Sequence, residues 1–166
     1  MGMDPAGQPV TDTGTAGVIA RPPLLFLAAL LIGFVLDRLL GLPWPVPGGD
    51  LVHWIIGGPL ILIGLALAAA GIGNFSRAGT PVRTITPTRA LVTTGIHGWT
   101  RNPIYLGMFL VYGGIGAAAE SLWTLVLTLP LAILIRYGVV AREEAYLVRL
   151  FGDAYRDYQA RVRRWL

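Results

Sequence analysis

The fold of this chain is decided by residues 93–107, which read Thr93-Thr94-Gly95-Ile96-His97-Gly98-Trp99-Thr100-Arg101-Asn102-Pro103-Ile104-Tyr105-Leu106-Gly107. Polar and aromatic side chains crowd into this stretch, whereas the long runs on both sides of it are strongly apolar. A second polar cluster, Arg142-Glu143-Glu144, follows the last apolar run. Such clusters are too polar to lie in lipid. We therefore expect the two clusters to meet at a membrane surface and to bind a charged cofactor between them.

The composition is that of a membrane protein. Of the 166 residues, 54% are hydrophobic and 13% are charged, whereas a soluble domain has about 25% charged residues. A chain of this length corresponds to one domain. The sequence therefore predicts an integral membrane protein rather than a soluble helical bundle.

Several chemistries are excluded by the residue types present. All 13 basic residues are arginine, so no lysine can form a Schiff base, and the absence of cysteine excludes disulfides, thiolate catalysis and cysteine-ligated metals. The chain has only two histidines, which argues against a histidine-rich metal site, and we expect no metal. His53, at the far end of the second apolar run, is expected to be structural. The net charge of +4 is not arranged as a basic patch interleaved with aromatic residues, so we expect no binding to nucleic acid.

Four apolar runs predict an all-α, polytopic membrane protein with about four transmembrane helices. The runs cover residues 22–40, 51–76, 103–119 and 121–135. About 20 apolar residues are needed to cross a bilayer, so the first run is just long enough. The second run carries no charge and is the clearest span. Asp37 and Arg38, near the end of the first run, are expected to pair with each other or to reach the lipid headgroups.

Two local patterns predict how these helices pack. Gly64, Ala68 and Gly71 recur at roughly helical spacing, and small residues allow another helix to approach closely. Only Glu120 and Ser121 separate the third run from the fourth, which predicts a tight helical hairpin.

The two ends of the chain are expected to lie on the same side of the membrane. Residues 1–20 are rich in Gly, Thr, Pro and Asp and predict a mobile tail, with one transmembrane domain over residues 21–166. Residues 142–166 are basic and amphipathic, which predicts a helical segment lying on an anionic membrane face. Arginines are concentrated in that segment and in residues 77–101. The positive-inside rule therefore places both termini and residues 77–101 in the cytoplasm.

The helix start at Arg101-Asn102-Pro103 has two interpretations. In the structural one, Asn102 caps the helix, Pro103 occupies the first turn and Arg101 reaches the lipid headgroups. In the functional one, the free N–H groups of the first turn bind an anionic group such as a carboxylate. Nearby His97 is a candidate base, hydrogen-bond donor or interfacial side chain.

The carboxylates of Glu143 and Glu144 also have two interpretations, one structural and one functional. In the structural interpretation they lie on a solvated helix face and pair with nearby arginines. On a helix, however, Glu143 shares a face with Leu147 and Phe151, which are expected to point inward. An inward carboxylate near the bilayer needs a partner, and ribose hydroxyls, a cation or Arg101 would each provide one.

From about residue 75 to residue 166, the chain resembles the isoprenylcysteine carboxyl methyltransferase and phospholipid methyltransferase superfamily of integral membrane enzymes. The matching motifs are Leu91-Val92-Thr93-Thr94-Gly95, Arg101-Asn102-Pro103-Ile104-Tyr105-Leu106-Gly107, Arg142-Glu143-Glu144 with Leu147, Phe151-Gly152, Tyr155, Tyr158 and Arg161-Val162. The Asn-Pro-Ile-Tyr-Leu-Gly run looks more like the phospholipid enzymes, whereas Phe-Gly-x-x-Tyr-x-x-Tyr resembles the carboxyl methyltransferases. The substrate-side arginine of the superfamily has no counterpart at the matching position, and the nearest arginine is Arg136.

The resemblance implies S-adenosylmethionine as the methyl donor, bound by about residues 75–166 without a Rossmann domain. The implied cofactor-binding residues are Arg89, Ala90, Leu91, Val92, His97, Asn102, Pro103, Ile104, Tyr105, Glu143 and Glu144. The residues expected to act in catalysis are His97, Arg101, Tyr105 and Glu144. Arg101 would bind the carboxylate of the cofactor, and Tyr105 and Trp99 would face the sulfonium through cation–π contact. A carboxylate acceptor needs no base, whereas an amine or thiol acceptor would lose a proton to His97 or Glu144.

The resulting hypothesis is an integral membrane, S-adenosylmethionine-dependent methyltransferase. Its acceptor would be lipophilic, either a prenylcysteine-like carboxylate or a phospholipid amine, and would enter sideways between helices at the cytoplasmic face. Expected partners are this substrate and membrane lipids. The alternative is a non-enzymatic four-helix membrane carrier or adaptor, in which both polar clusters serve as anchors.

Overall fold

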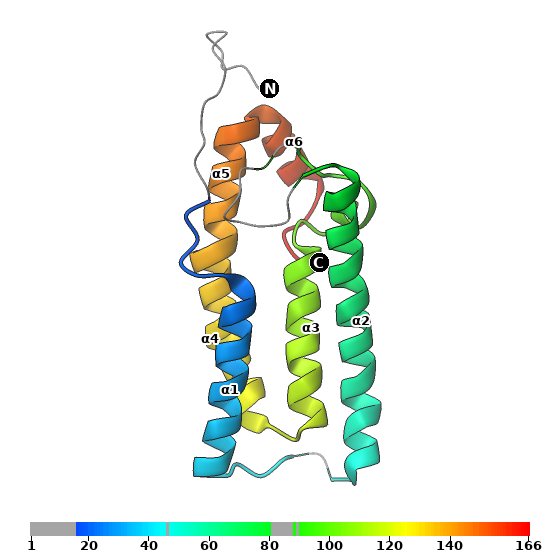
Figure 1. Cartoon of the computed structure of the whole chain (residues 1–166), viewed down its shortest axis with the longest axis vertical. Helices are drawn as coiled ribbons and strands as arrows, with labels where there is room; N and C mark the ends of the chain where they lie inside the picture. The colour runs from blue at the N-terminus through cyan, green and yellow to red at the C-terminus, as the bar shows by residue number, and fades with distance from the viewer. Residues whose placement is uncertain (1–15, 46, 81–87, 89) are drawn as a thin grey trace.

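The computed structural model describes residues 16–45, 47–80, 88 and 90–166, and within these residues the regular structure is entirely helical. The helices are α1 (Pro22–Leu40), α2 (Asp50–Arg77), the 3-10 helix η1 (Gly95–Gly98), α3 (Pro103–Ala118), α4 (Leu122–Ile135), the π-helix η2 (Arg136–Val140), α5 (Ala141–Phe151) and α6 (Asp153–Arg161). The predicted all-α fold is confirmed. Helices α1 to α4 run alternately up and down beside one another, and α5 and α6 lie beyond one end of them (Figure 1).

Three helices are long and apolar enough to cross a membrane. They are α1, α2 and the continuous helix Leu122–Phe151 that α4, η2 and α5 form together. The third apolar run gives α3, which has 16 residues and is shorter than the other three. In Figure 1, α3 lies between α1 and α2.

Small residues bring α2 and α3 into close contact, as predicted. A Cβ atom added at Gly64 of α2 would lie 2.6 Å from the carbonyl oxygen of Gly107 on α3. A Cβ atom added at Gly71 would lie 2.7 Å from Cγ1 of Ile104, in the first turn of α3. The absence of side chains at these positions therefore allows α2 to hold the start of α3 in place.

The C-terminal helices differ from the prediction of an amphipathic helical segment that lies on the membrane face. Helix α4 continues through η2 into α5 without a break, so the first part of residues 142–166 extends the fourth span. The chain turns only at Gly152, whose φ of 54° is readily adopted by glycine. A π-turn takes up one more residue than an α-turn, so η2 also changes the face that α5 presents to α3.

The described part of the predicted N-terminal tail contacts η2 and the first turn of α5. The N–H of Ile19 donates to the carbonyl oxygen of Gly138 at 3.2 Å. The guanidinium of Arg142 donates to the carbonyl oxygen of Gly17 at 2.8 Å. Residues 1–15, the remainder of that tail, lie outside the described residues.

The predicted hairpin between α3 and α4 lies at the end of the bundle away from α5 and α6, which is called the opposite end below. The N-cap of α4 is Ser121, whose Oγ accepts from the N–H of Thr124 at 3.2 Å and donates to Asp37 of α1. The other carboxylate oxygen of Asp37 accepts from the N–H of Trp123 at 3.3 Å. The prediction that Asp37 pairs with Arg38 or reaches the lipid headgroups is therefore wrong, because this carboxylate binds Ser121 and the N–H of Trp123 at the N-terminus of α4.

His53 also lies at this opposite end. Its side chain is 1% exposed, and its Nδ1 is 2.6 Å from a carboxylate oxygen of Glu120 in the α3–α4 turn. The pair connects the start of α2 to the end of α3, in keeping with the structural role expected for His53.

Candidate functional site

The two polar clusters of the sequence meet where α3 begins and the last spanning helix passes into α5. The hydroxyl of Tyr105 donates to Oε1 of Glu143 at 2.8 Å. The guanidinium of Arg101 donates to Oε1 of Glu144 at 2.8 Å. The partners are 38 and 43 residues apart in the sequence, so the packing of the helices brings them together.

Glu144 is held by two arginines. Its Oε1 accepts from Arg101 and from Nε of Arg164, the latter at 3.0 Å, and its Oε2 accepts from a terminal nitrogen of Arg164 at 2.6 Å. The Glu144 side chain is 10% exposed, and a carboxylate this buried requires paired positive charge. The hydrogen bond to Glu144 also raises the pKa of Arg164. Two guanidinium groups on one carboxylate give this cluster a net positive charge.

Glu143 is bound less completely. Its Oε1 accepts from Tyr105, and among the described residues its second oxygen has no hydrogen-bond partner. Its side chain lies at the wall of a cavity. An incompletely paired carboxylate at a cavity wall is suited to bind a cation or hydroxyl groups of a ligand.

The first turn of α3 has no side-chain cap. Pro103 is the first helical residue, as the structural interpretation predicted, and Asn102 occupies the N-cap position. The Asn102 amide, however, donates to the carbonyl oxygen of Arg164 at 3.0 Å instead of accepting from the helix. The first-turn N–H groups of Ile104 and Tyr105 consequently lack intrahelical acceptors, and an anion could bind there.

His97 is buried beside this helix start. It lies on η1 and is 3% exposed, with its ring 4.9 Å from that of Phe75 in an edge-on contact. The Asn74 amide lies 3.4 Å from Nδ1 of His97, and Tyr158 donates to the His97 carbonyl oxygen at 2.6 Å. Burial lowers the pKa of His97, so its imidazole is neutral near pH 7. Burial likewise raises the pKa of Tyr158, to about 12.

These groups line one cavity of about 580 Å³, a volume within the usual range for small-molecule sites. Its walls come from the starts of α1 and α3, the end of α2, residues 90–92, η1, α5 and α6. The predicted site residues that line it are Ala90, Leu91, Val92, His97, Arg101, Asn102, Pro103, Ile104, Tyr105, Glu143 and Glu144. Arg89, also predicted, lies outside the described residues.

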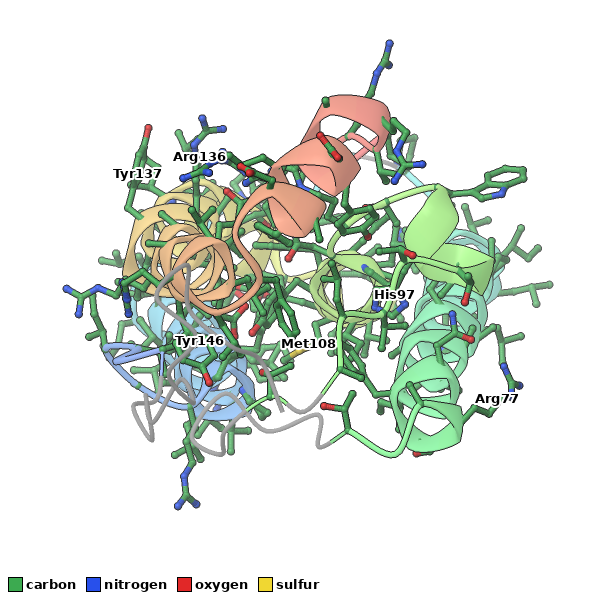
Figure 2. All side chains as sticks on the ribbon, turned by 90° about the horizontal axis from the view of Figure 1, so that it is seen from above. Arg77, His97, Met108, Arg136, Tyr137 and Tyr146 are labelled. Atoms are coloured by element: carbon green, nitrogen blue, oxygen red, sulfur yellow. The ribbon has the colours of Figure 1, made fainter. Side chains whose placement is uncertain are left out.

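Two residues considered from the sequence are not at the cavity. Trp99 is 83% exposed, so the expected contact of its ring with a bound sulfonium is not supported. The short η1 helix turns the chain so that His97 is buried and Trp99 faces outward. Arg136 and Tyr137 also point away from the helices (Figure 2), and the Arg136 guanidinium lies 5.4 Å from the centre of the Tyr137 ring.

The structure adds residues that the sequence reasoning missed. Asn74 donates to the carbonyl oxygen of Thr94 at 2.8 Å and accepts from Arg77 at 2.9 Å, which connects the end of α2 to η1. A lone amide near the end of the uncharged run over residues 51–76 was the available signal. Arg164 lies in a run of arginines, and no pattern distinguished it from its neighbours.

A second, apolar groove adjoins the cavity. It has a volume of about 220 Å³ and is lined by Phe26, Leu27, Leu30, Leu65, Ala68, Met108, Val111, Tyr112 and Ile115, from α1, α2 and α3. Met108 lines both spaces and lies centrally among the helices (Figure 2). The cavity and the apolar groove therefore share Met108 as a lining residue.

Comparison with known proteins gives one family and several relatives. Residues 52–154, more than half of the chain, match the model of the family described as phospholipid methyltransferase. The chain is 37% identical over 73 residues to the protein-S-isoprenylcysteine O-methyltransferase of Schizosaccharomyces pombe, which covers 43% of this chain and 30% of that protein. It is 38% identical over 72 residues to the nickel-cobalt-cadmium resistance protein NccN of Alcaligenes xylosoxydans xylosoxydans, which covers 43% of this chain and 33% of that protein.

A shorter match is found to an uncharacterized protein of Haemophilus influenzae. The two chains are 63% identical over 27 residues, which is 16% of this chain and 43% of that protein. The matched segments cover less than half of the length of each of these three relatives. No solved structure matches the chain.

Proposed function

The chain belongs to the phospholipid methyltransferase family, and we propose that it is a membrane enzyme that methylates a lipophilic acceptor with S-adenosylmethionine. One observation carries the proposal: residues 101–105 and 143–144 meet around a single cavity of about 580 Å³. The acceptor is a prenylcysteine-like carboxylate or a phospholipid amine, and each has a polar head on a hydrocarbon chain. The proposal includes the domain assignment, with a tail over residues 1–20 and the cofactor bound by about residues 75–166.

The residues of the cavity fit the polar and apolar parts of this cofactor. Nε of Arg101 is buried without a partner among the described residues, and with the N–H groups of Ile104 and Tyr105 it provides donors for a carboxylate. Glu143 can accept from an ammonium or from ribose hydroxyls. Apolar side chains such as Leu91 line the same cavity and can cover the adenine ring. The cofactor supplies a methyl group on a positively charged sulfur.

The chain's own contribution to catalysis is positioning and the exclusion of water. The hydroxyl of Tyr105 is held by Glu143, which fixes its ring at the cavity wall. A carboxylate acceptor requires no base, whereas an amine acceptor must lose a proton. The neutral imidazole of His97 is suited to accept that proton. Glu144 acts as a fixed anion in this proposal, because both of its oxygens already accept from arginines.

The acceptor's hydrocarbon chain would occupy the apolar groove between α1, α2 and α3. That groove adjoins the cavity at Met108, so a lipid entering sideways from the bilayer could place its head group in the cavity. The hydrophobic effect favours this arrangement, since each buried methylene contributes about 0.8 kcal/mol. Membrane lipids and the lipophilic substrate are the proposed partners.

The cavity and both termini are proposed to face the cytoplasm. Among the described residues, Arg38 is the one arginine located at the opposite end of the bundle, and the positive-inside rule orients a chain by such an imbalance. The natural chain has no cysteine, so single cysteines can report its topology. Ala160→Cys should react with an impermeant maleimide in inside-out vesicles and Gly49→Cys in right-side-out vesicles. The reverse pattern would contradict this orientation.

Titration of the purified protein with S-adenosylmethionine tests the central claim. Saturable binding is expected for the wild type, and much weaker binding for Glu143→Ala and Asn102→Ala. Trp99→Ala is a matched control, because Trp99 is exposed and lies outside the cavity lining. A wild type that does not bind, or two variants that bind as well as the wild type, would favour the carrier or adaptor instead.

The acceptor is then identified with radiolabelled cofactor. Purified protein is incubated with vesicles that contain a prenylcysteine or an amine phospholipid, and label in the extracted lipid is counted. The His97→Gln variant should lose more activity toward the amine acceptor than toward the carboxylate acceptor, because only the amine has to lose a proton. Label in neither lipid would contradict both proposed acceptors.

A further inference from the structure

The chain beyond α6 returns to the start of α3. Residues 159–166, here called the C-terminal strap, leave helical geometry at Val162, which has φ −120° and ψ 130°. The N–H of Arg101 donates to the carbonyl oxygen of Arg163 at 3.0 Å. The side chains of Thr100 and Asn102 donate to the carbonyl oxygen of Arg164 at 3.2 and 3.0 Å. Three consecutive residues ahead of α3 therefore hold the strap.

The Arg101 side chain adds two further bonds to the strap. Its NH1 nitrogen donates to the carbonyl oxygens of Gln159 and Val162 at 3.0 and 2.7 Å. These oxygens lie at the end of α6, where carbonyl groups lack intrahelical donors. The other terminal nitrogen of Arg101 donates to Glu144. One buried guanidinium thus connects the strap, α3 and α5.

Arg164 closes this arrangement from the side of the strap. It donates twice to Glu144, and paired hydrogen bonds from arginine to a carboxylate fix both distance and orientation. Trp165, the next residue, packs edge-on against Phe109 of α3, with ring centres 6.3 Å apart. The strap is consequently anchored on both α3 and α5, the two helices that carry Tyr105 and Glu143.

Glu144 and Glu143 are adjacent in the sequence, and both line the cavity. Two carboxylates this close repel one another unless positive charge compensates one of them. Arg164 and Arg101 supply that compensation at Glu144. Without Arg164, the half-paired Glu144 would move toward solvent, and the first turn of α5 would move with it.

We infer that Arg164 is a positioning residue: by binding Glu144 it clamps the C-terminal strap against α3 and holds α5 so that Glu143 faces the ligand. Arg164 is not among the residues that line the cavity, so it acts through Glu144 and not by touching the ligand. This inference rests on the proposed function for its ligand. The clamp, which is the contact between Arg164 and Glu144 that holds the strap against α3, can be measured without any ligand.

The test measures cofactor affinity for full-length variants in lipid nanodiscs. Arg164→Ala should weaken S-adenosylmethionine binding by about tenfold or more, because it leaves a buried charge half paired. Arg164→Lys keeps the charge but loses the paired hydrogen bonds to Glu144. Its affinity for S-adenosylmethionine should therefore fall between those of the wild type and Arg164→Ala. Arg161→Ala is the matched control, because among the described residues the exposed side chain of Arg161 donates to the backbone carbonyl oxygen of Asp157 in its own helix. This variant should bind within about twofold of the wild type.

A double variant shows whether Arg164 acts through Glu144. In the Glu144→Gln background, Arg164→Ala should cause little further loss of affinity, since the partner is already absent. If the loss of affinity in the double variant instead equals the product of the two single losses, Arg164 acts independently of Glu144 and the inference is wrong.

Hydrogen exchange without ligand separates this inference from the proposed function. Arg164→Ala should speed amide exchange in residues 100–102 and 159–166, whereas Arg161→Ala should not. If the wild type fails to bind the cofactor while exchange responds as stated, the proposed ligand is wrong and the clamp stands. Unchanged exchange in Arg164→Ala would overturn the clamp, whatever the binding result.

Discussion

The two ends of this helical bundle both contain buried polar side chains, but they use them differently. At the end away from the cavity, Asp37 binds the N-terminus of α4 and His53 pairs with Glu120. At the cavity end, Glu143 is only partly bonded among the described residues, and α3 begins without a side-chain cap. Polar groups that satisfy one another stabilise a fold, whereas those left with open hydrogen-bonding capacity beside a cavity are available to a ligand.

This difference predicts two classes of variant. Changes to the groups that would contact or orient the ligand, Glu143 and Tyr105, should alter ligand affinity with little effect on stability. Changes at the opposite end should lower stability and leave ligand affinity intact. The following predictions test the separation, from the largest expected effect to the smallest.

Glu143→Gln should have the largest effect, at the cavity end. The amide keeps the size of the side chain but removes its charge, and the loss of a charged hydrogen bond to the ligand weakens binding by about 10- to 100-fold. Calorimetric titration with S-adenosylmethionine measures the change, and thermal unfolding should be nearly unaltered. An affinity within twofold of the wild type would remove Glu143 from the site.

Tyr105→Phe should have the next largest effect. It removes the donor that orients Glu143 and retains the ring, so we expect binding about 3- to 10-fold weaker. Tyr137→Phe provides the control, because Tyr137 is exposed and points away from the helices (Figure 2). Equal affinities for the two variants would show that the orientation of Glu143 does not depend on this hydroxyl.

Asp37→Ala should show the reverse pattern at the opposite end. Loss of the carboxylate from the N-terminus of α4 should lower the free energy of unfolding by about 1 kcal/mol. Denaturation in detergent measures this change, and the affinity for S-adenosylmethionine should stay at the wild-type value. A variant that unfolds normally but binds weakly would break the proposed division between the two ends.

His97 should give the smallest effect, seen in the pH dependence of stability. Burial lowers its pKa in the folded protein, so the unfolded chain binds a proton at higher pH than the folded one. Stability should therefore be complete above the unfolded pKa of about 6.5 and decrease as the pH falls below it. His97→Gln should make the stability between pH 7 and pH 5 less dependent on pH. The same slope in both proteins would contradict a buried, neutral His97.

Much of this arrangement could be predicted because it depends on local patterns. The apolar runs marked four helices, and the Arg101-Asn102-Pro103 sequence marked the start of α3. The orientation of Trp99 could not be predicted, since it depends on a single turn of η1. The extension of the fourth span into α5 was missed, because the charged Arg142-Glu143-Glu144 cluster looked like the end of a membrane helix.

By itself, the sequence determined the helical class of this protein, the positions of its polar clusters and its family resemblance. Hydropathy and helix-start signals are properties of neighbouring residues, so they can be read without coordinates. Only the tertiary structure decided that Tyr105 bonds to Glu143, that Arg164 holds Glu144, and that Asp37 binds the N-terminus of a distant helix. These pairings join residues 20 to 86 positions apart, and such contacts arise from how the helices pack against one another.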